Sequence, residues 1–195
     1  MPRNSFGTRR WNWICRRIWC PLLLGFTLLP FGCSERSRTI ENPKALANLK
    51  SQAAEVSRAM LEEDHARMAD LTHPLLIKHF GSRDAYIKKL EEIAKDLRGQ
   101  GLKFQSFEFE APSVLHESGG VLYAIYPYSL RLTGPKGEPA RKPTYLICTS
   151  NDSGANWKFL DGEGVKGDRA KLKQLLPGFP DNLSLPEPQP LEVLR

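Results

Sequence analysis

The spacing of apolar residues changes near position 100, and this change constrains the fold more than any other feature of the chain. Before it, apolar residues recur every three or four positions, as in Leu46, Leu49 and Ala53, which is the period of an α-helix. From Leu102 onward they recur at every second position, which is the period of a β-strand. Helices followed by consecutive strands predict the α+β class, with the helices packed on an antiparallel sheet.

Three helices are predicted in the first part of the chain. Asn42 and Pro43 form a typical N-cap and first-turn pair, so the first helix begins at residue 43. Pro74 interrupts the helical pattern, and a short helix over residues 75–80 follows it. Ser82 caps the third helix. The apolar stripe of that helix consists of Tyr86, Leu90, Ile93 and Leu97.

Four strands are predicted after the helices, over residues 102–109, 121–132, 144–150 and 156–161. The odd step between Phe104 and Phe107 in the first of them indicates a β-bulge. Turn-forming residues separate the later strands, so neighbouring strands are expected to run antiparallel.

Residues 1–32 have the composition of an export signal. Five arginines and no acidic residue precede an apolar run over residues 18–31, and Gly32-Cys33 follows it. The run is shorter than the ~20 residues that span a bilayer. A cysteine at this break resembles the lipobox of bacterial lipoproteins, which implies a lipid on Cys33 and a membrane-anchored protein on the periplasmic or outer face of the cell envelope. Ordinary cleavage and an uncleaved anchor are the alternatives.

The leader also accounts for the basic charge of the chain. The net charge is +6, but the leader holds five of the 28 basic residues and none of the 22 acidic ones. The remainder therefore has 23 basic and 22 acidic residues and a net charge of +1, so no nucleic-acid partner is predicted.

After the leader the chain divides into three parts. Residues 33–42 are predicted to be a tether, residues 43–176 the α+β domain, and residues 177–195 a proline-rich, weakly ordered tail. Cys148 is the one cysteine after Cys33, and it lies in an apolar strand. It is therefore expected to be a buried free thiol, and neither a metal site nor a cofactor is predicted.

The order of these elements resembles that of a known superfamily. A long helix, a helix broken at Pro74, a third helix and then four strands is similar to the cystatin-like cone of nuclear transport factor, ketosteroid isomerase and scytalone dehydratase. Residues 72–81 and 145–161 are also similar to segments of small secreted bacterial proteins of this type. The resemblance covers residues 43–165 and implies a curved four-stranded sheet. It is compatible with a binding domain and with a cone-fold isomerase, dehydratase or hydrolase.

A short motif predicts one specific turn. Ser150, Asp152, Gly154 and Trp157 match the Asp-box pattern of sialidase-like β-propellers, where it occurs once per blade. In that pattern the aspartate satisfies turn N–H groups, the glycine adopts a conformation that other residues resist, and the tryptophan packs beneath. A single copy predicts a structural hairpin between the third and fourth strands. A remnant of a glycan site is the alternative.

No catalytic residue is predicted. Burying Phe107 and Phe109 turns the neighbouring glutamates toward solvent, and the helical candidates converge only if the helix junction folds back. An inward-facing acid with a raised pKa beside Tyr or His in an open cavity would favour an enzyme, whereas a solid core with an exposed apolar sheet face would favour a binding module. The acid–base candidates considered are His65, Asp70, His73, His79, Glu108 and Glu110.

Three tyrosines predict a ligand pocket. Tyr126 and Tyr128 lie on the apolar face of the second strand, and Tyr86 lies on the stripe of the third helix. Because buried phenol hydroxyls need partners, a cavity lined by these residues would suit an amphipathic ligand. A filled core with tyrosine tips at its edge is the alternative.

The second and third strands are apolar on both faces, although only one face can cover the helices. We therefore expect a homodimer, or a contact with an envelope protein, centred on Tyr123, Ile125, Tyr145 and Ile147. In the alternative, residues 168–179 fold back over this face through Leu172, Leu175, Leu176 and Phe179. Together these features predict a non-enzymatic envelope lipoprotein that binds a small ligand or a partner protein, with a cone-fold enzyme as the alternative.

Overall fold

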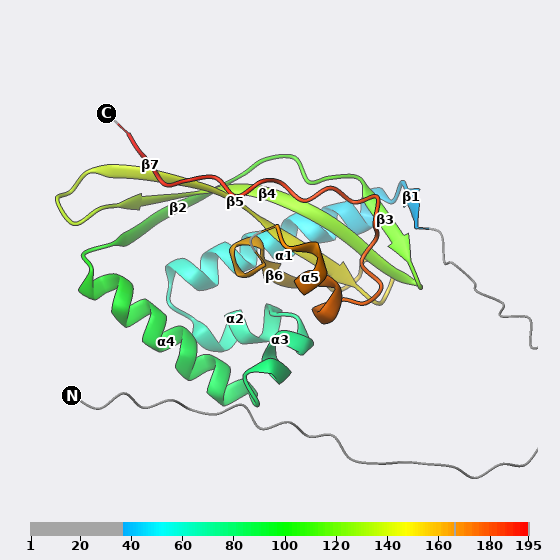
Figure 1. Cartoon of the computed structure of the whole chain (residues 1–195), viewed down its shortest axis with the longest axis horizontal. Coiled ribbons are helices and arrows are strands. Elements are labelled where there is room, and N and C mark those ends of the chain that lie inside the picture. The colour runs from blue at the N-terminus through cyan, green and yellow to red at the C-terminus, as the bar shows by residue number, and fades with distance from the viewer. Residues whose placement is uncertain (1–36, 166, 195) are drawn as a thin grey trace, which may run out of the picture. The chain divides into compact units, whose positions relative to one another are not determined.

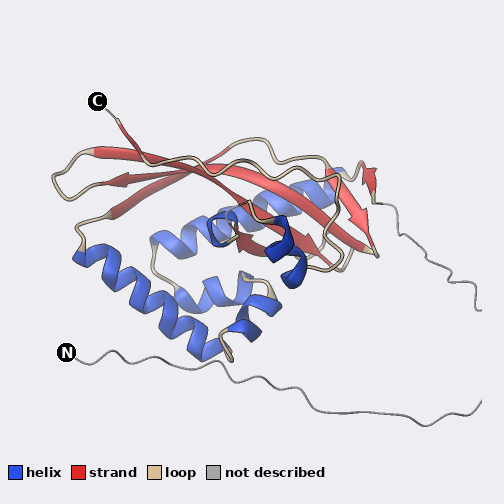
Figure 2. Ribbon diagram, viewed as in Figure 1, coloured by secondary structure: helices blue, strands red, loops and turns tan. Residues whose placement is uncertain are grey.

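The computed structural model describes residues 37–165 and 167–194. The predicted export signal and Cys33 lie outside these residues. Within the described part, four helices come first and the long strands of the sheet follow (Figure 2). The α+β class is therefore confirmed.

The helices begin where the sequence provides caps. The Asn42 side chain accepts a hydrogen bond from the Ala45 N–H at 3.0 Å, and the Ser82 hydroxyl accepts one from the Ala85 N–H at 3.1 Å. The four helices are α1 (Pro43–Leu61), α2 (His65–Leu71), α3 (Pro74–His79) and α4 (Arg83–Gly99).

The first predicted helix is divided in two. Glu63 has a φ of +55°, in the left-handed region, and it ends the path of α1. Asp64 then caps α2 by accepting a hydrogen bond from the Arg67 N–H at 2.9 Å. Continuous helical spacing did not reveal this break because both halves keep an apolar face.

The strands form one antiparallel sheet that is larger than the predicted four strands. Its path runs β1-β3-β4-β5-β6, with β2 paired to β4 and β7 paired to β5. The predicted β-bulge is confirmed as a register shift between Phe104 and Ser106. The strands are β1 (Arg38–Ile40), β2 (Lys103–Phe109), β3 (Leu115–Ser118), β4 (Val121–Thr133), β5 (Pro139–Ser150), β6 (Lys158–Asp161) and β7 (Glu192–Val193).

The predicted tether is wrong in its second half, because residues 38–40 form β1. This strand pairs with β3, and Arg38 forms an ion pair with Glu117 across the two strands at 2.8 Å. The sequence analysis also missed β3. Gly119 and Gly120 join it to β4, both with positive φ, which is the two-residue turn that matches the twist of a hairpin.

The helices and the C-terminal segment cover opposite faces of the sheet. The inner face carries the even-numbered side chains of β4 and β5, such as Ala124 and Cys148, which pack with α1. The outer face carries odd-numbered side chains, such as Tyr123 and Ile147. The short helix η1 (Gly162–Gly164) and α5 (Arg169–Leu175) follow β6, and the last segment (red in Figure 1) then runs alongside β4 and β5.

The prediction of a weakly ordered tail over residues 177–195 also needs correction, because part of this segment is buried and paired with the sheet. Phe179 and Leu183 are 2% and 3% exposed, and β7 extends the sheet by pairing with β5. The Arg169 guanidinium donates to the carbonyl oxygens of Pro180 at 2.9 Å and Leu183 at 2.6 Å. Prolines keep this segment extended, but its apolar residues fall where they can be buried on the sheet.

The outer face is therefore not a free surface. The four residues of the expected dimer contact are between 0% and 4% exposed, and they pack with Leu172, Leu176 and Phe179. The chain buries this apolar face with its own C-terminal segment, as in the alternative stated above. Tyr123, Ile125, Tyr145 and Ile147 are thus covered in the folded chain and are not available as the centre of a dimer contact, and association itself stays a prediction.

Candidate ligand site

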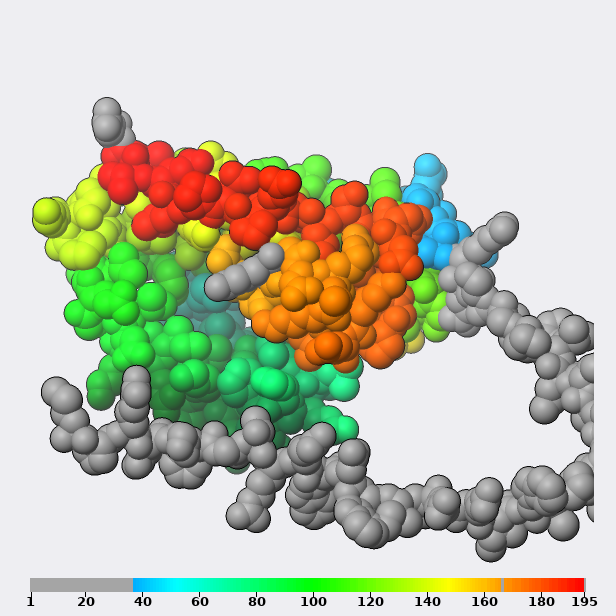
Figure 3. Space-filling view, in the orientation of Figure 1, coloured from blue at the N-terminus to red at the C-terminus, as the bar shows by residue number. Residues whose placement is uncertain are grey.

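The inner face of the sheet is covered unevenly. At one end, Ala45, Leu49 and Ala53 of α1 are buried in the same cluster as Leu122 and Trp157. At the other end, α4 packs against α2 and α3 and has no fully buried residue. Figure 3 shows the surface hollowed between these helices (green) and the segment after β6 (orange). We call this region the interior site.

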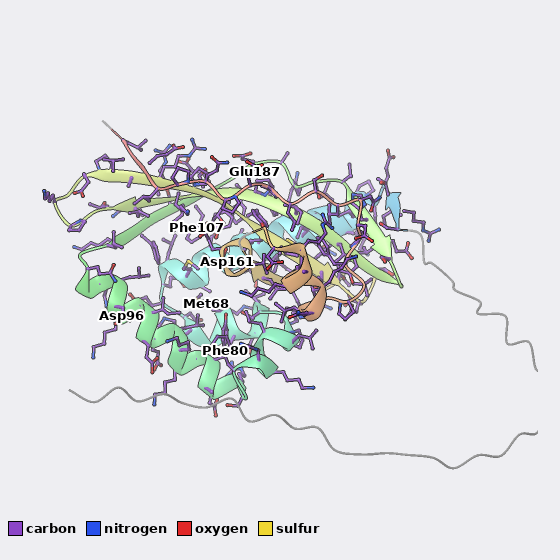
Figure 4. All side chains as sticks on the ribbon, in the orientation of Figure 1. Met68, Phe80, Asp96, Phe107, Asp161 and Glu187 are labelled. Atoms are coloured by element: carbon purple, nitrogen blue, oxygen red, sulfur yellow. The ribbon has the colours of Figure 1, made fainter. Side chains whose placement is uncertain are left out.

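Half-buried apolar side chains line the interior site. Phe107 and Leu130 on the sheet are only partly buried, and so are Met68 on α2 and Leu90 on α4. In Figure 4 the labelled Phe107 and Asp161 lie on the sheet side of the hollow and Met68 on the helix side. Half-buried apolar side chains on the two sides of a hollow form a surface suited to an apolar ligand.

The three predicted pocket tyrosines do not all meet. Tyr126 is 5% exposed and packs against Phe109 with ring centroids 4.8 Å apart, so it belongs to the filled core. Tyr128 stacks on Phe107 at 5.5 Å. Tyr86 is half-buried, and its hydroxyl lies 3.3 Å from the Thr72 hydroxyl. Tyr86 and Tyr128 both lie close enough to Asp161 for its charge to act on their phenols.

Asp161 is the polar residue that sequence reasoning missed. It ends β6 opposite Leu146 and two residues after Phe159, so it shares the inner face with both. The residue stays exposed from one side, but the enclosing protein raises the pKa of its carboxyl. The Glu163 N–H lowers that pKa in part, and it donates to the carboxylate at 3.1 Å.

The charge of Asp161 acts on both tyrosines. Burial raises the pKa of the Tyr128 phenol well above its ordinary value, and Asp161 and Glu163 raise it further. Burial also raises the pKa of Tyr86, the hydrogen bond with Thr72 lowers it in part, and Asp161 raises it again. Both phenols therefore stay protonated at neutral pH and can donate hydrogen bonds. Because Asp161 follows Phe159 by two residues on β6, the strand period would have placed its side chain on the inner face.

His73 lies beside this group but serves the backbone. Its backbone N–H donates to the Phe159 carbonyl at 3.0 Å, and its ring Nδ1 accepts a hydrogen bond from the Leu75 N–H at 3.3 Å as the cap of α3. Burial lowers the pKa of its imidazole, and the charge of Lys158 lowers it further. The neutral ring is thus held in a structural role.

The other acid–base candidates are not brought into the interior site. Asp70 pairs with Arg83 at 2.8 Å and Glu108 pairs with Arg131 at 2.8 Å, both on the surface. Glu108 and Glu110 are exposed, as the alternation with Phe107 and Phe109 predicted. His65 is half-buried and His79 is exposed, and His79 packs edge-on against Phe80 at 5.6 Å.

The residues of the Asp-box pattern form the turn between β5 and β6. The Asp152 carboxylate accepts hydrogen bonds from the Asn156 N–H at 2.8 Å and from its side-chain amide at 2.7 Å. These bonds, and one from Ser150, lower the pKa of Asp152 to about 2. Gly154 has a φ of +87°, and a Cβ there would lie 2.2 Å from the Ala45 side chain. The turn is therefore seated directly on α1.

Trp157 joins the same turn to the core. It is 1% exposed, its indole N–H donates to the Ala45 carbonyl at 3.2 Å, and its backbone N–H donates to Gln52 at 2.8 Å. Cys148 is likewise fully buried on the inner face, where burial raises the pKa of its thiol well above the ordinary value. These contacts hold the scaffold that carries the interior site.

Chemically, the interior site combines an apolar lining with one carboxylate and two phenol donors. Such a site can bind the apolar body of a ligand and hydrogen-bond its polar end. Within the described residues, no helix is both long and apolar enough to cross a lipid bilayer. Comparisons of this chain with protein-family models, with curated proteins and with solved structures gave no match.

Proposed function

We propose that this chain is an exported lipoprotein of the bacterial envelope, anchored through Cys33, whose domain is a cystatin-like cone that binds a small amphipathic ligand. The cone is supported by the order of its elements and by α1, which packs on the inner face of an antiparallel sheet. The anchor is supported by the basic leader, the apolar run and the cysteine that follows it.

One observation carries the ligand proposal. Asp161, on the inner face, remains exposed beside two buried or half-buried tyrosines, while apolar side chains of β2, β4, α2 and α4 around it stay half-buried. A fully packed domain buries such groups, because each exposed apolar Å² costs roughly 25 cal/mol. A ligand with an apolar body and a polar end would cover the apolar lining and bond to Asp161, Tyr86 or Tyr128.

A fluorescent apolar anion, 1-anilinonaphthalene-8-sulfonate, tests this proposal. We expect its emission to rise on binding the native protein and to fall back in the variants Phe107→Ala and Leu90→Gln. Val114→Ala is the matched control, because Val114 is an apolar residue that is 61% exposed and lies outside the site. Equal emission from all four proteins would contradict an interior site.

Acid–base catalysis is a second candidate, and the environment of Asp161 favours it. A carboxyl with a raised pKa beside two protonated phenols can accept a proton while the phenols stabilise a developing oxyanion. This supports an isomerase, dehydratase or hydrolase that acts on a small molecule. Deuterium exchange into a panel of enolisable ketones, followed by NMR, tests this function. Exchange that is unchanged in Asp161→Asn would exclude it.

The anchor has its own test. Cys33→Ala should move the protein from the membrane fraction to a soluble or unprocessed form, because the acylated thiol is removed. Mass spectrometry of the wild-type N-terminus measures the modification directly. An unmodified N-terminus, or retention of residues 1–32, would defeat the proposal of a lipid anchor.

A further inference from the structure

A histidine is buried on the outer face of the sheet, where the tail (residues 177–195) crosses it. His116 is 6% exposed and follows Leu115 on β3. Because Leu115 belongs to the inner cluster, the strand alternation places His116 on the outer face. The residue opposite His116 on β4 is Tyr123, which belongs to the outer cluster.

The tail covers the sheet at this place. The Phe179 ring meets the Tyr123 ring edge-on, with centroids 5.7 Å apart, and a Cβ on Gly178 would lie 2.9 Å from the Tyr123 hydroxyl oxygen. Farther along the tail, Leu183 is 3% exposed and belongs to the same cluster. His116 is therefore enclosed beside the point where the tail is seated on β4.

One ring nitrogen of His116 has no partner. Its Nδ1 is buried and forms no hydrogen bond with any described residue. A neutral imidazole can leave this nitrogen as an unprotonated acceptor, whereas a protonated imidazole carries an N–H on both nitrogens. A buried donor of a charged group that lacks an acceptor is costly in free energy. Protonation of His116 is therefore incompatible with the enclosed position.

The charged groups on the neighbouring elements do not compensate a protonated imidazole. Glu117 of β3 pairs with Arg38 of β1 at 2.8 Å, and the strand alternation places both on the opposite face from the imidazole. On the tail, Asp181 pairs with Lys173 of α5. Arg169 of α5 donates to two tail carbonyls and is itself a cation. The enclosed position thus offers no free anion to a positive ring.

The direction of the resulting pH dependence follows from burial. Burial lowers the pKa of the His116 imidazole below its ordinary value of 6.5. Burial also raises the pKa of the Tyr123 phenol, so that group stays neutral over the same range. With the tail released, water reaches the imidazole and its pKa returns toward 6.5. The covered state therefore binds fewer protons, and its stability is full above pH 6.5 and is lost as the pH falls through the lowered pKa.

We propose that His116 makes the docking of the tail sensitive to pH: the neutral imidazole permits the tail to cover the outer face, and the protonated imidazole releases it. Release uncovers Tyr123 and part of the outer cluster, so acidification exposes an apolar surface that is covered at neutral pH. The proposal is independent of the interior site and of the lipid anchor.

Hydrogen exchange of the full chain in detergent tests the proposal, with rates expressed as protection factors so that the intrinsic pH dependence cancels. The Phe179 N–H donates to the Leu176 carbonyl at 2.9 Å and reports on the docked tail. Its protection should fall several-fold between pH 7.5 and pH 5, whereas the Cys148 amide on the central strand β5 should keep its protection. Equal losses at both amides would mean unfolding of the whole domain and would overturn the proposal.

Variants assign the effect to one residue. His116→Phe and His116→Gln cannot take up the proton, so in either variant the protection of Phe179 should be the same at both pH values. His73→Asn is the matched control, because burial lowers the pKa of His73 as well, and asparagine can replace it as the cap of α3. That variant should keep the wild-type pH dependence of the tail.

A measurement on the wild type alone keeps the result decisive if the variants do not fold. The NMR titration of the His116 ring should have its midpoint below pH 6.5, and the loss of Phe179 protection should have the same midpoint. Tail protection that does not change from pH 7.5 to pH 5, or a loss that persists in His116→Phe, would contradict a tail controlled by His116.

Discussion

Replacing Phe179 by alanine should cost this domain a large part of its stability, because the residue anchors the C-terminal segment on the outer face of the sheet. Its ring is 2% exposed and meets the Tyr123 ring edge-on, with centroids 5.7 Å apart. The Arg169 guanidinium lies 5.4 Å from the centre of the same ring. Phe179→Ala removes all three kinds of contact at once.

The magnitude follows from these contacts. Burial of a whole aromatic side chain contributes about 1.5–3 kcal/mol. The edge-on aromatic pair adds about 0.5–1.5 kcal/mol, and the cation over the ring adds about 0.5–1 kcal/mol at a site of this kind. The expected loss is therefore about 3–5 kcal/mol, as for other buried phenylalanines. Domains of this size are stable by only about 5–15 kcal/mol.

Urea unfolding of the wild-type and variant proteins measures this loss. With an m-value of about 2 kcal/mol/M, the midpoint should fall by roughly 1.5–2.5 M. Leu191→Ala is the matched control, because Leu191 lies on the same tail but is 48% exposed. Its effect should stay within about 0.5 kcal/mol. Equal midpoints for the Phe179 and Leu191 variants would refute a tail docked through Phe179.

Three further outcomes follow from the turn and the interior site. Trp157→Ala should lower the free energy of unfolding by about 3–5 kcal/mol, measured by urea unfolding, because the indole is fully buried. The pKa of Asp152 lies at about 2 in the folded state, below its ordinary 3.8, so its contribution to stability is present above pH 4 and lost as the pH falls toward 2. Between pH 4 and pH 2 the free energy of unfolding of Asp152→Asn should therefore fall less than that of the wild type, as measured by acid unfolding. The pKa of Asp161 is raised instead, so its ionisation weakens the fold. Thermal unfolding should show Asp161→Asn to be more stable than wild type at pH 7 but not at pH 3.

Removal of the tail would also test the idea of association. Truncation before residue 177 removes Phe179 and Leu183 and should expose Tyr123 and part of the outer cluster, and the shortened chain should associate or aggregate in sedimentation. The full chain keeps this surface covered. A truncated chain that stays monomeric at high concentration would contradict the view that the tail serves as its cover.

Local sequence patterns predicted the class and most of the elements. The caps at Asn42 and Ser82 and the odd step after Phe104 correspond to observed helix starts and to an observed bulge. These features succeed because each depends on interactions between residues that are near in sequence. The break at Glu63 was missed, since a single residue with positive φ leaves the apolar pattern on either side unchanged.

The candidate site was predictable only in part. Tyr86 and Tyr128 could be assigned to inward faces from the helical and strand periods, and the structure places both beside Asp161. The strand period places Tyr126 on the same face, but its ring packs against Phe109 in the closed core. The period of apolar residues predicts which face of an element a side chain lies on. Whether that face is closely packed or leaves a cavity depends on the other elements that cover it.

By itself, the sequence determined the α+β class, the alternation that turns Glu108 and Glu110 outward, and the turn chemistry between β5 and β6, because all of these depend on neighbours within a few residues. Only the tertiary structure decided what covers the apolar outer face. Burial is a free energy that depends on area and not on sequence distance, so Phe179 and Leu183 of the proline-rich tail could take the place that a second protein was expected to fill.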